Sequence, residues 1–239
     1  MIPSIIKKYA FYFSDYEREI SHEGILFNLD IRHLIDRTFY INREYEEQSF
    51  QNLVDVINDQ SSEYFLDVGA CWGIYSLRLA KKFDKLKIKA IDPIKKNINR
   101  INESINKNKF SNIEVFHTAL GDTNGTILLG SNSDWSPNYK INEEDTEVTE
   151  QSLIKPLDDL FNLKDNKIVM KIDVEGFEFE MLSGAKEILT NNKSYLQIEI
   201  RYENYDKIEK LLNEIGYYNY KGTKPHKPNT YADCNFQNY

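Results

Sequence analysis

Four acidic residues each stand where an apolar, strand-like segment ends: Asp67, Asp92, Asp173 and Glu199. In an open α/β sheet, ligands bind at the carboxyl ends of the strands. A single carboxylate there is often only a helix cap, and Asp92 before Pro93 fits that role. Four carboxylates on one rim repel one another unless a cation or hydrogen-bond donors lie among them. The set therefore indicates a ligand site at this edge of the sheet.

The segment FLDVGACWGIY, residues 65–75, has a turn with Gly69 and Gly73 between a strand-like and a helix-like half. It is not a GxGxxG turn, because Cys71 replaces the glycine that lets a pyrophosphate approach the backbone. It also lacks the lysine of a P-loop. A nucleoside that bears an amino acid instead of phosphates suits this turn better. Asp92, at the end of the next strand-like segment, is placed to bind both ribose hydroxyls.

Cys71 is also a candidate nucleophile, but no histidine stands near it in sequence, so covalent catalysis is the weaker interpretation. The other cysteine is Cys234, and neither belongs to a CxxC motif or a His/Cys cluster. We therefore expect no disulfide framework and no structural zinc site. This cysteine usage favours a reducing compartment, the cytoplasm.

The composition is that of an ordinary globular protein, with 41% hydrophobic and 28% charged residues in a chain of 239. The formal net charge is −8, and Lys and Arg are mixed with Asp and Glu along the chain. Because nucleic-acid binders usually carry a basic patch, we expect no nucleic-acid partner. The first twenty residues are too interrupted by charge for a signal peptide or a membrane span. Residues 2–13 form either an amphipathic surface helix or a segment packed on the domain.

Strand-like and helix-like segments alternate from residue 61 onward. The expected strands cover 63–69, 86–92, 112–120, 167–173 and 195–201, and the expected helices cover 74–83, 93–108, 177–189 and 205–217. Strands joined by helices form right-handed βαβ units in a parallel sheet. The last two strand-like segments, 217–220 and 231–239, are too close together for a crossover helix, so they must be antiparallel. The pattern predicts a doubly wound α/β sheet whose last strand is reversed.

Two further parts surround this core. Residues 1–60 are predicted to form a helical and hairpin extension packed on the core, with a strand over 24–31 and a helix over 42–59, and residues 61–239 to form the main domain. Residues 130–150 are polar and irregular, which predicts a surface insertion. Its Trp135 and Tyr139 either stack on a sugar or simply pack on the surface.

Three separate motifs, FLDVGACWGIYSLRLA, VMKIDVEGFEFEMLSGAKEIL and LQIEI, together resemble the FkbM family of S-adenosylmethionine-dependent methyltransferases. The most specific part is KIDVEGFE followed by LSGA, and the resemblance covers about residues 24–236. It implies the class I methyltransferase fold, a Rossmann-like α/β sheet that is mostly parallel, with seven strands and the last one antiparallel.

The resemblance also implies S-adenosyl-L-methionine as the cofactor, bound at the first strand turn. The methionine part would lie at the turn, the ribose at Asp92, and the adenine near 120–122, while Asp67 would orient the turn or the amino group. The implied cofactor-binding residues are Asp67, Gly69, Ala70, Trp72, Gly73, Asp92, Leu120, Gly121 and Asp122. The chain departs from the family at Cys71, where a small polar residue is common, and at Asp92, where glutamate is more frequent.

The family is associated with O-methylation of hydroxyls on glycans or small metabolites. Such a transfer requires an aligned acceptor oxygen and a base for its proton. The candidate catalytic residues are Asp173, Glu175, Glu199 and His226. A carboxylate here can act as the base, bind a divalent cation that acidifies the hydroxyl, or hold sugar hydroxyls. Alternatively, Glu175 caps the helix that follows, and His226 is a solvated residue of the basic loop KGTKPHKPNT, which is also a candidate lid or binding loop for an acidic sugar.

The function expected from these observations is S-adenosylmethionine-dependent O-methyltransfer to a small-molecule or carbohydrate acceptor. An NAD-dependent oxidoreductase or epimerase on a Rossmann sheet is one alternative, against which the missing GxGxxG turn argues. A non-catalytic binding module that keeps the fold is the other. The acidic residues at the strand ends argue against it.

Overall fold

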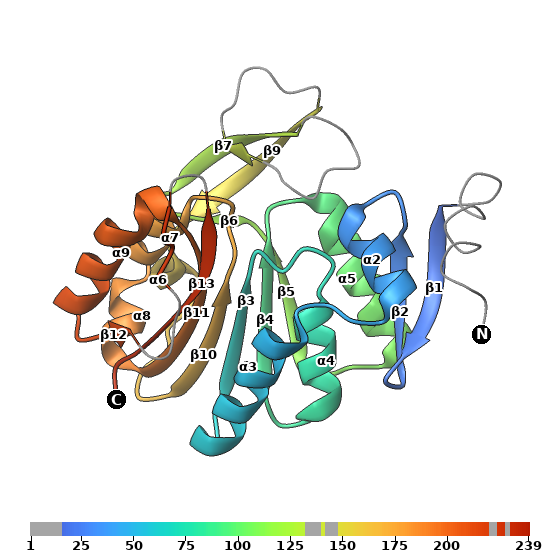
Figure 1. Ribbon diagram of the computed structural model, residues 1–239, viewed down its shortest axis with the longest axis horizontal. Helices are drawn as coiled ribbons and strands as arrows, with labels where there is room; N and C mark the ends of the chain where they lie inside the picture. The colour runs from blue at the N-terminus through green and yellow to red at the C-terminus, as the bar shows by residue number, and fades with distance from the viewer. Residues whose placement is uncertain (1–15, 132–139, 142–147, 220–223, 228–229) are drawn as a thin grey trace.

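We describe the protein from a computed structural model, in which residues 16–131, 140–141, 148–219, 224–227 and 230–239 are described (Figure 1). The expectations for residues 2–13 and for Trp135 and Tyr139 lie outside these ranges. Among the helices of the described ranges, none combines the length and the apolar character that a membrane span requires.

The centre of the molecule is a seven-stranded sheet with the order β12-β13-β11-β10-β3-β4-β5. Its strands are β3 (Tyr64–Val68), β4 (Lys87–Asp92), β5 (Ile113–His117), β10 (Lys167–Ile172), β11 (Lys193–Arg201), β12 (Tyr218–Asn219) and β13 (Tyr231–Gln237). The strands from β5 to β11 pair in parallel, and β13 is antiparallel to both β11 and β12. This confirms the predicted fold, including the reversed last strand.

Helices cover both faces of this sheet (Figure 1). They include α4 (Ile74–Lys82), α5 (Lys95–Asn108), α6 (Leu157–Leu160), α7 (Glu178–Ser183), α8 (Lys186–Asn191) and α9 (Tyr202–Glu214). Apolar residues at helical spacing, such as Ile98 and Ile101 of α5, are buried against the strands. The helix expected over 177–189 is two helices, because the chain bends at Gly184, where a Cβ atom would lie 1.9 Å from the Gly121 carbonyl oxygen.

The N-terminal part packs beside α4 and α5 (Figure 1). It consists of the hairpin β1 (Glu17–His22) and β2 (Ile25–Asp30), followed by α2 (Leu34–Asn42) and α3 (Glu47–Gln60). The sequence predicted the second hairpin strand and α3 but not α2. Phe27, Phe39 and Phe50 share one hydrophobic cluster with Trp72 and Leu77. The N-terminal elements and the sheet therefore share a core, and the division of the chain at residue 60 stays a prediction.

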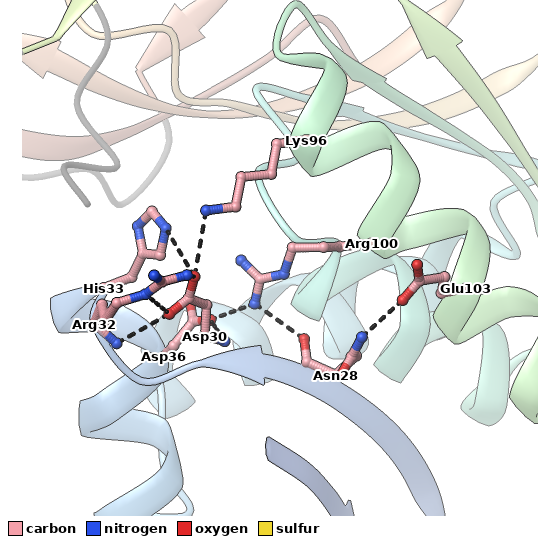
Figure 2. A network of polar contacts seen from close by, with 8 residues as sticks. All are labelled: Asn28, Asp30, Arg32, His33, Asp36, Lys96, Arg100 and Glu103. Atoms are coloured by element: carbon pink, nitrogen blue, oxygen red, sulfur yellow. Dashed lines mark hydrogen bonds and ion pairs between the residues drawn. The ribbon is translucent and has the colours of Figure 1, made fainter. Parts of the chain in front are cut away.

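A polar network also attaches this part to α5 (Figure 2). The buried Asp36 of α2 pairs with Arg100 of α5, and Arg100 also donates to the Asn28 carbonyl oxygen at 3.0 Å. Asp30 accepts hydrogen bonds from Arg32 and from Lys96 of α5. The contacts fix α2 and β2 on the helix that follows β4.

A smaller sheet projects above the main one (Figure 1). It has the order β6-β9-β7-β8, with β6 (Ala119–Leu120), β7 (Gly125–Ser131), β8 (Lys140–Ile141) and β9 (Val148–Lys155). The expectation that residues 130–150 are irregular is thus wrong in three places. Residues 130–131 belong to β7, 140–141 to β8 and 148–150 to β9, and these strands pair through their backbones.

Candidate active site

One cavity opens at the carboxyl ends of β3, β4 and β10. Among the residues that line it are eight that the sequence predicted for the site: Asp67, Gly69, Ala70, Trp72, Asp92, Leu120, Asp173 and Glu175. The fold therefore brings the glycine turn, the acidic end of β4 and the KIDVEG segment to one place.

Five other predicted site residues do not line this cavity. Gly73 is the N-cap of α4 and its N–H donates to the Ala70 carbonyl oxygen at 2.7 Å, and Gly121 packs against Ile154. Asp122 and His226 are exposed, and Glu199 lies on β11. At the end of β5, the cavity wall is formed by Thr118, Ala119 and Leu120 instead of 121–122. The roles assigned to these five residues, like those of the eight that line the cavity, stay predictions.

The glycine turn depends on a close approach between two backbone segments. Gly69 has φ +80°, and a Cβ atom there would lie 1.8 Å from the carbonyl oxygen of Asp173. The N–H groups of Gly69 and Ala70 both donate to the Ile91 carbonyl oxygen at 3.0 Å. Only glycine accommodates this conformation and this contact, so Gly69 holds the ends of β3, β4 and β10 together.

Asp67 fixes the start of the helix after the turn. One of its carboxylate oxygens accepts hydrogen bonds from the Ser76 hydroxyl at 2.6 Å and the Ser76 N–H at 3.2 Å. The side chain is buried, and this burial raises its pKa against the opposing effect of the Ser76 hydrogen bonds. These contacts support the expectation that Asp67 orients the turn.

Asp92 makes the helix-start contacts that its sequence position suggested, and it also faces the cavity, whereas its ribose-binding role stays a prediction. It lines the cavity, and its carboxylate accepts from Ile94 N–H at 2.8 Å and Asn97 Nδ2 at 3.1 Å near the start of α5, and from Cys71 N–H at 2.8 Å in the glycine turn. Burial raises the pKa of Asp92 to about 7 although these hydrogen bonds lower it. A carboxylate has about four acceptor positions, so one is left for a ligand hydroxyl.

Cys71 does not have the environment of a nucleophile. Burial and the nearby Asp92 raise the pKa of its thiol, whereas reactive cysteines have a lowered pKa. Its positive φ of 50° places it in the tight turn between Ala70 and Gly73. The structure therefore agrees with the sequence in making covalent catalysis by Cys71 the weaker interpretation.

Lys171 of β10 is a site residue that the sequence analysis missed. It is 8% exposed, it lines the cavity, and its Nζ lies 3.1 Å from Asp173 Oδ2 and 5.0 Å from the centre of the Tyr75 ring. Burial lowers its pKa, but the neighbouring carboxylates of Asp173, Glu46 and Asp67 outweigh this, so the net shift is upward. A lysine inside the apolar run VMKID was the available signal, because a buried lysine requires a charged partner.

Glu175 lines the cavity with a backbone that few residues adopt, at φ +54°. Burial and the nearby Asp173 raise its pKa to about 7. The helix-cap interpretation of Glu175 is wrong, because α7 begins at Glu178 and it is the Glu178 carboxylate that accepts the Gly176 N–H at 2.7 Å. Glu175 is thus not needed to start the helix.

Glu199 lies on β11, the strand beside β10, and its pKa is raised to about 8 by burial and by Asp173. Asp173 also acts to raise the pKa of Glu175. The carboxylate of Asp173 is therefore close enough to those of Glu175 and Glu199 to disfavour their ionised forms. The fourth candidate, His226, is exposed and does not line the cavity.

The N-terminal part supplies one wall of the cavity. Ile35 of α2 and Tyr45 before α3 line it, and Tyr75 of α4 donates from its hydroxyl to Glu46 at 2.7 Å. The rings of Tyr45 and Tyr75 are 6.5 Å apart, edge to face. No sequence signal identifies Ile35 or Tyr45, because their position results from the packing of distant segments.

A divalent cation is usually bound by several oxygen ligands, mostly carboxylates. Within the described ranges, no group of three or more His, Cys, Asp or Glu side chains is arranged to hold a metal ion. The divalent cation that the sequence left open therefore has no ligand set among these residues.

A parallel sheet with one reversed strand and a cavity at its carboxyl ends defines the class I methyltransferase architecture. The methyltransferase FkbM domain matches residues 67–220, which is more than half of the chain. The chain therefore belongs to the FkbM methyltransferase family. No curated protein matches it.

Solved structures of methyltransferases have the same fold. A methyltransferase FkbM from Methylobacillus flagellatus is 21% identical with a TM-score of 0.52, and the match covers 74% of this chain and 43% of that one. TYW2 from M. jannaschii, in complex with AdoMet, is 16% identical with a TM-score of 0.51 over 95% of this chain and 89% of that one. The bifunctional kinase-methyltransferase WbdD is 12% identical with a TM-score of 0.53, over 87% and 43%. This chain thus spans less than half of the FkbM and WbdD structures, and at these identities the likeness concerns the fold.

Proposed function

We propose that the protein is an S-adenosylmethionine-dependent O-methyltransferase that acts on a hydroxyl of a small molecule or carbohydrate. The observation that carries the proposal is the single cavity in which the glycine turn, Asp92 and the carboxylates of Asp173 and Glu175 meet. Membership of the FkbM family supports it. The cytoplasmic location and the absence of a nucleic-acid partner remain predictions.

The residues of the cavity fit this cofactor by their chemistry. Ile94, Ala119, Leu120 and Phe177 give one part of the wall an apolar surface suited to adenine. Asp92 has an acceptor position free for a ribose hydroxyl, and the carboxylates of Asp173 and Glu175 suit a positively charged ligand group. When bound, S-adenosylmethionine supplies a methyl group on a positively charged sulfur.

Glu175 is the proposed general base. Its pKa of about 7 is close to neutral pH, where a base combines a useful ionised fraction with proton affinity. The carboxylate accepts the proton that the acceptor hydroxyl loses. Asp173 is held by Lys171 at 3.1 Å, so it is fixed in place to orient the acceptor.

Calorimetry with S-adenosylhomocysteine, the product of the cofactor, tests the proposal. We expect saturable binding, and no heat at millimolar concentration would contradict it. A thermal-shift comparison with NAD separates the oxidoreductase alternative. A rise in Tm with S-adenosylhomocysteine and not with NAD is expected, and the reverse result would favour the oxidoreductase.

A further inference from the structure

Two rows of polar side chains cross the main sheet beside the cavity. The strand registers place Asp67, Lys171, Gln197 and Asn235 opposite one another on β3, β10, β11 and β13. The next row toward the carboxyl ends contains Glu199 and Asp233, which are direct partners, and Asp173, which follows the last paired residue of β10. The second row therefore consists of carboxylates alone.

These rows lie on the sheet face that α3 covers. Tyr195, two residues before Gln197, belongs to the same hydrophobic cluster as Phe50 of α3, and alternate residues of a strand share a face. The hydroxyl of Ser49 at the start of α3 donates to Asp233 at 2.6 Å. The rows therefore run from the cavity toward β13, between the strand ends and α3.

Positive charge is scarce along this path. Lys171 is bound to Asp173, and Arg201 stacks over the Tyr231 ring at 4.9 Å and lies against Gly176. The carboxylates of Asp173, Glu175 and Asp233 all act to raise the pKa of Glu199. In this part of the described chain, the carboxylates outnumber the cations, so a ligand that brings positive charge would be stabilised.

Gln197 gives a second and independent indication of a ligand. It is 2% exposed, and neither the oxygen nor the nitrogen of its amide has a hydrogen-bond partner among the described residues. Leaving a buried polar group unpaired costs about 1–3 kcal/mol. Gln197 lies between Lys171 and Asn235 in the first row, and it is on the same face of the sheet as Glu199. Its amide is therefore placed to contact a polar group bound along the carboxylate row.

We infer that the acceptor carries an ammonium group, as an amino sugar does, and that Glu199 and Asp233 bind this group while Gln197 contacts a neighbouring polar group. The inference rests on the proposed function, because it places the acceptor beside the methyl-transfer cavity. Neighbouring strands are about 4.8 Å apart, so Asp233 lies about 10 Å from the Asp173 position. The row thus extends beyond the cofactor cavity.

The basic loop after β12 does not offer an opposing site for an acidic acceptor within its described residues. Lys224 pairs with Asp206 of α9 at 3.0 Å, and His226 is exposed. Neither residue lines the cavity. The charge at the site therefore favours a cationic acceptor over the acidic sugar considered from the sequence.

The test compares matched cationic and neutral sugars, glucosamine with glucose and kanamycin with maltotriose, by ligand-observed NMR with saturating S-adenosylhomocysteine. We expect the cationic member of at least one pair to bind at least about tenfold more tightly. Glu199→Gln should abolish this difference, whereas Glu214→Gln, which removes the same charge from an exposed position on α9, should preserve it. Equal binding or no binding within both pairs, or an equal loss in the two variants, would overturn the inference.

Gln197→Leu separates a binding role from a structural one. A structural role would lower Tm and leave amine binding intact, and this result would contradict the assignment of Gln197. We expect the opposite, weaker amine binding with an unchanged or higher Tm, because the variant removes an unpaired buried amide. Binding of S-adenosylhomocysteine itself tests the proposed function. If it binds and the sugars are not discriminated, only the ammonium inference fails.

Discussion

Glu175 combines two properties of a general base: it lines the cavity, and its pKa is raised to about 7. Glu175→Gln keeps the shape and removes proton acceptance. We expect kcat to fall by about 10²–10⁴-fold, the range of general base catalysis. Affinity for S-adenosylhomocysteine should change little. Glu187→Gln, at an exposed position on α8, is the control.

The pH dependence follows from the sign of the same shift. A base must be unprotonated to act, so kcat/KM should rise with pH through about 7, where Glu175 loses its proton. The variant Glu175→Gln should lose this rise. A wild-type profile that is flat between pH 5 and pH 8 would contradict the assignment.

Asp92 accepts a hydrogen bond at the start of α5 and, in our account, also binds the ribose of the cofactor. Asp92→Ala should weaken S-adenosylhomocysteine binding by about tenfold, since one hydrogen bond contributes about 1–1.5 kcal/mol. Loss of the cap should also lower the free energy of unfolding by about 1 kcal/mol. Calorimetry and urea denaturation measure the two effects separately. A stability loss with unchanged affinity would leave Asp92 only the structural role.

At the scale of elements, Gly69 in the β3–α4 turn and Gly216 after α9 show that glycines with positive φ are not equivalent. Gly69 and Gly216 both have positive φ, but only at Gly69 would a Cβ atom meet other atoms, at 1.8 Å from the Asp173 carbonyl oxygen. Gly216→Ala should cost about 1 kcal/mol from backbone strain alone. Gly69→Ala should cost about 3 kcal/mol, as overpacking does, and should separate the turn from β10. Similar losses in urea denaturation would show that the contact is not required.

The elements that could be predicted from the sequence are those with a local signal. The isoleucine spacing of α5 and the apolar run of β10 specify their own structure, and the short connection between β12 and β13 specifies their antiparallel pairing. The break at Gly184 and the cavity wall at Tyr45 have no local signal, because each depends on a segment distant in sequence. The strand-end carboxylates could be predicted because each one directly follows an apolar, strand-like segment. Lys171 was not predicted as a site residue, because it lies inside such a segment.

At the scale of the whole molecule, the N-terminal elements complete the site, and the network between α2 and α5 holds them there (Figure 2). Asp36→Ala leaves Arg100 buried without its partner, so the free energy of unfolding should fall by about 3–5 kcal/mol. Glu103→Ala removes an exposed contact to Asn28 in the same network and should cost less than about 0.5 kcal/mol. Urea denaturation distinguishes the two, and equal losses would show that the buried pair is not what holds α2.

The central claim is that the cavity at the ends of β3, β4 and β10 holds the cofactor with its reactive centre toward the carboxylates. A crystal structure with bound S-adenosylhomocysteine tests it most directly. The account predicts the ribose at Asp92 and the sulfur facing Asp173 and Glu175, with Glu199 on the acceptor side. A ligand bound elsewhere, or a sulfur facing away from these carboxylates, would contradict it.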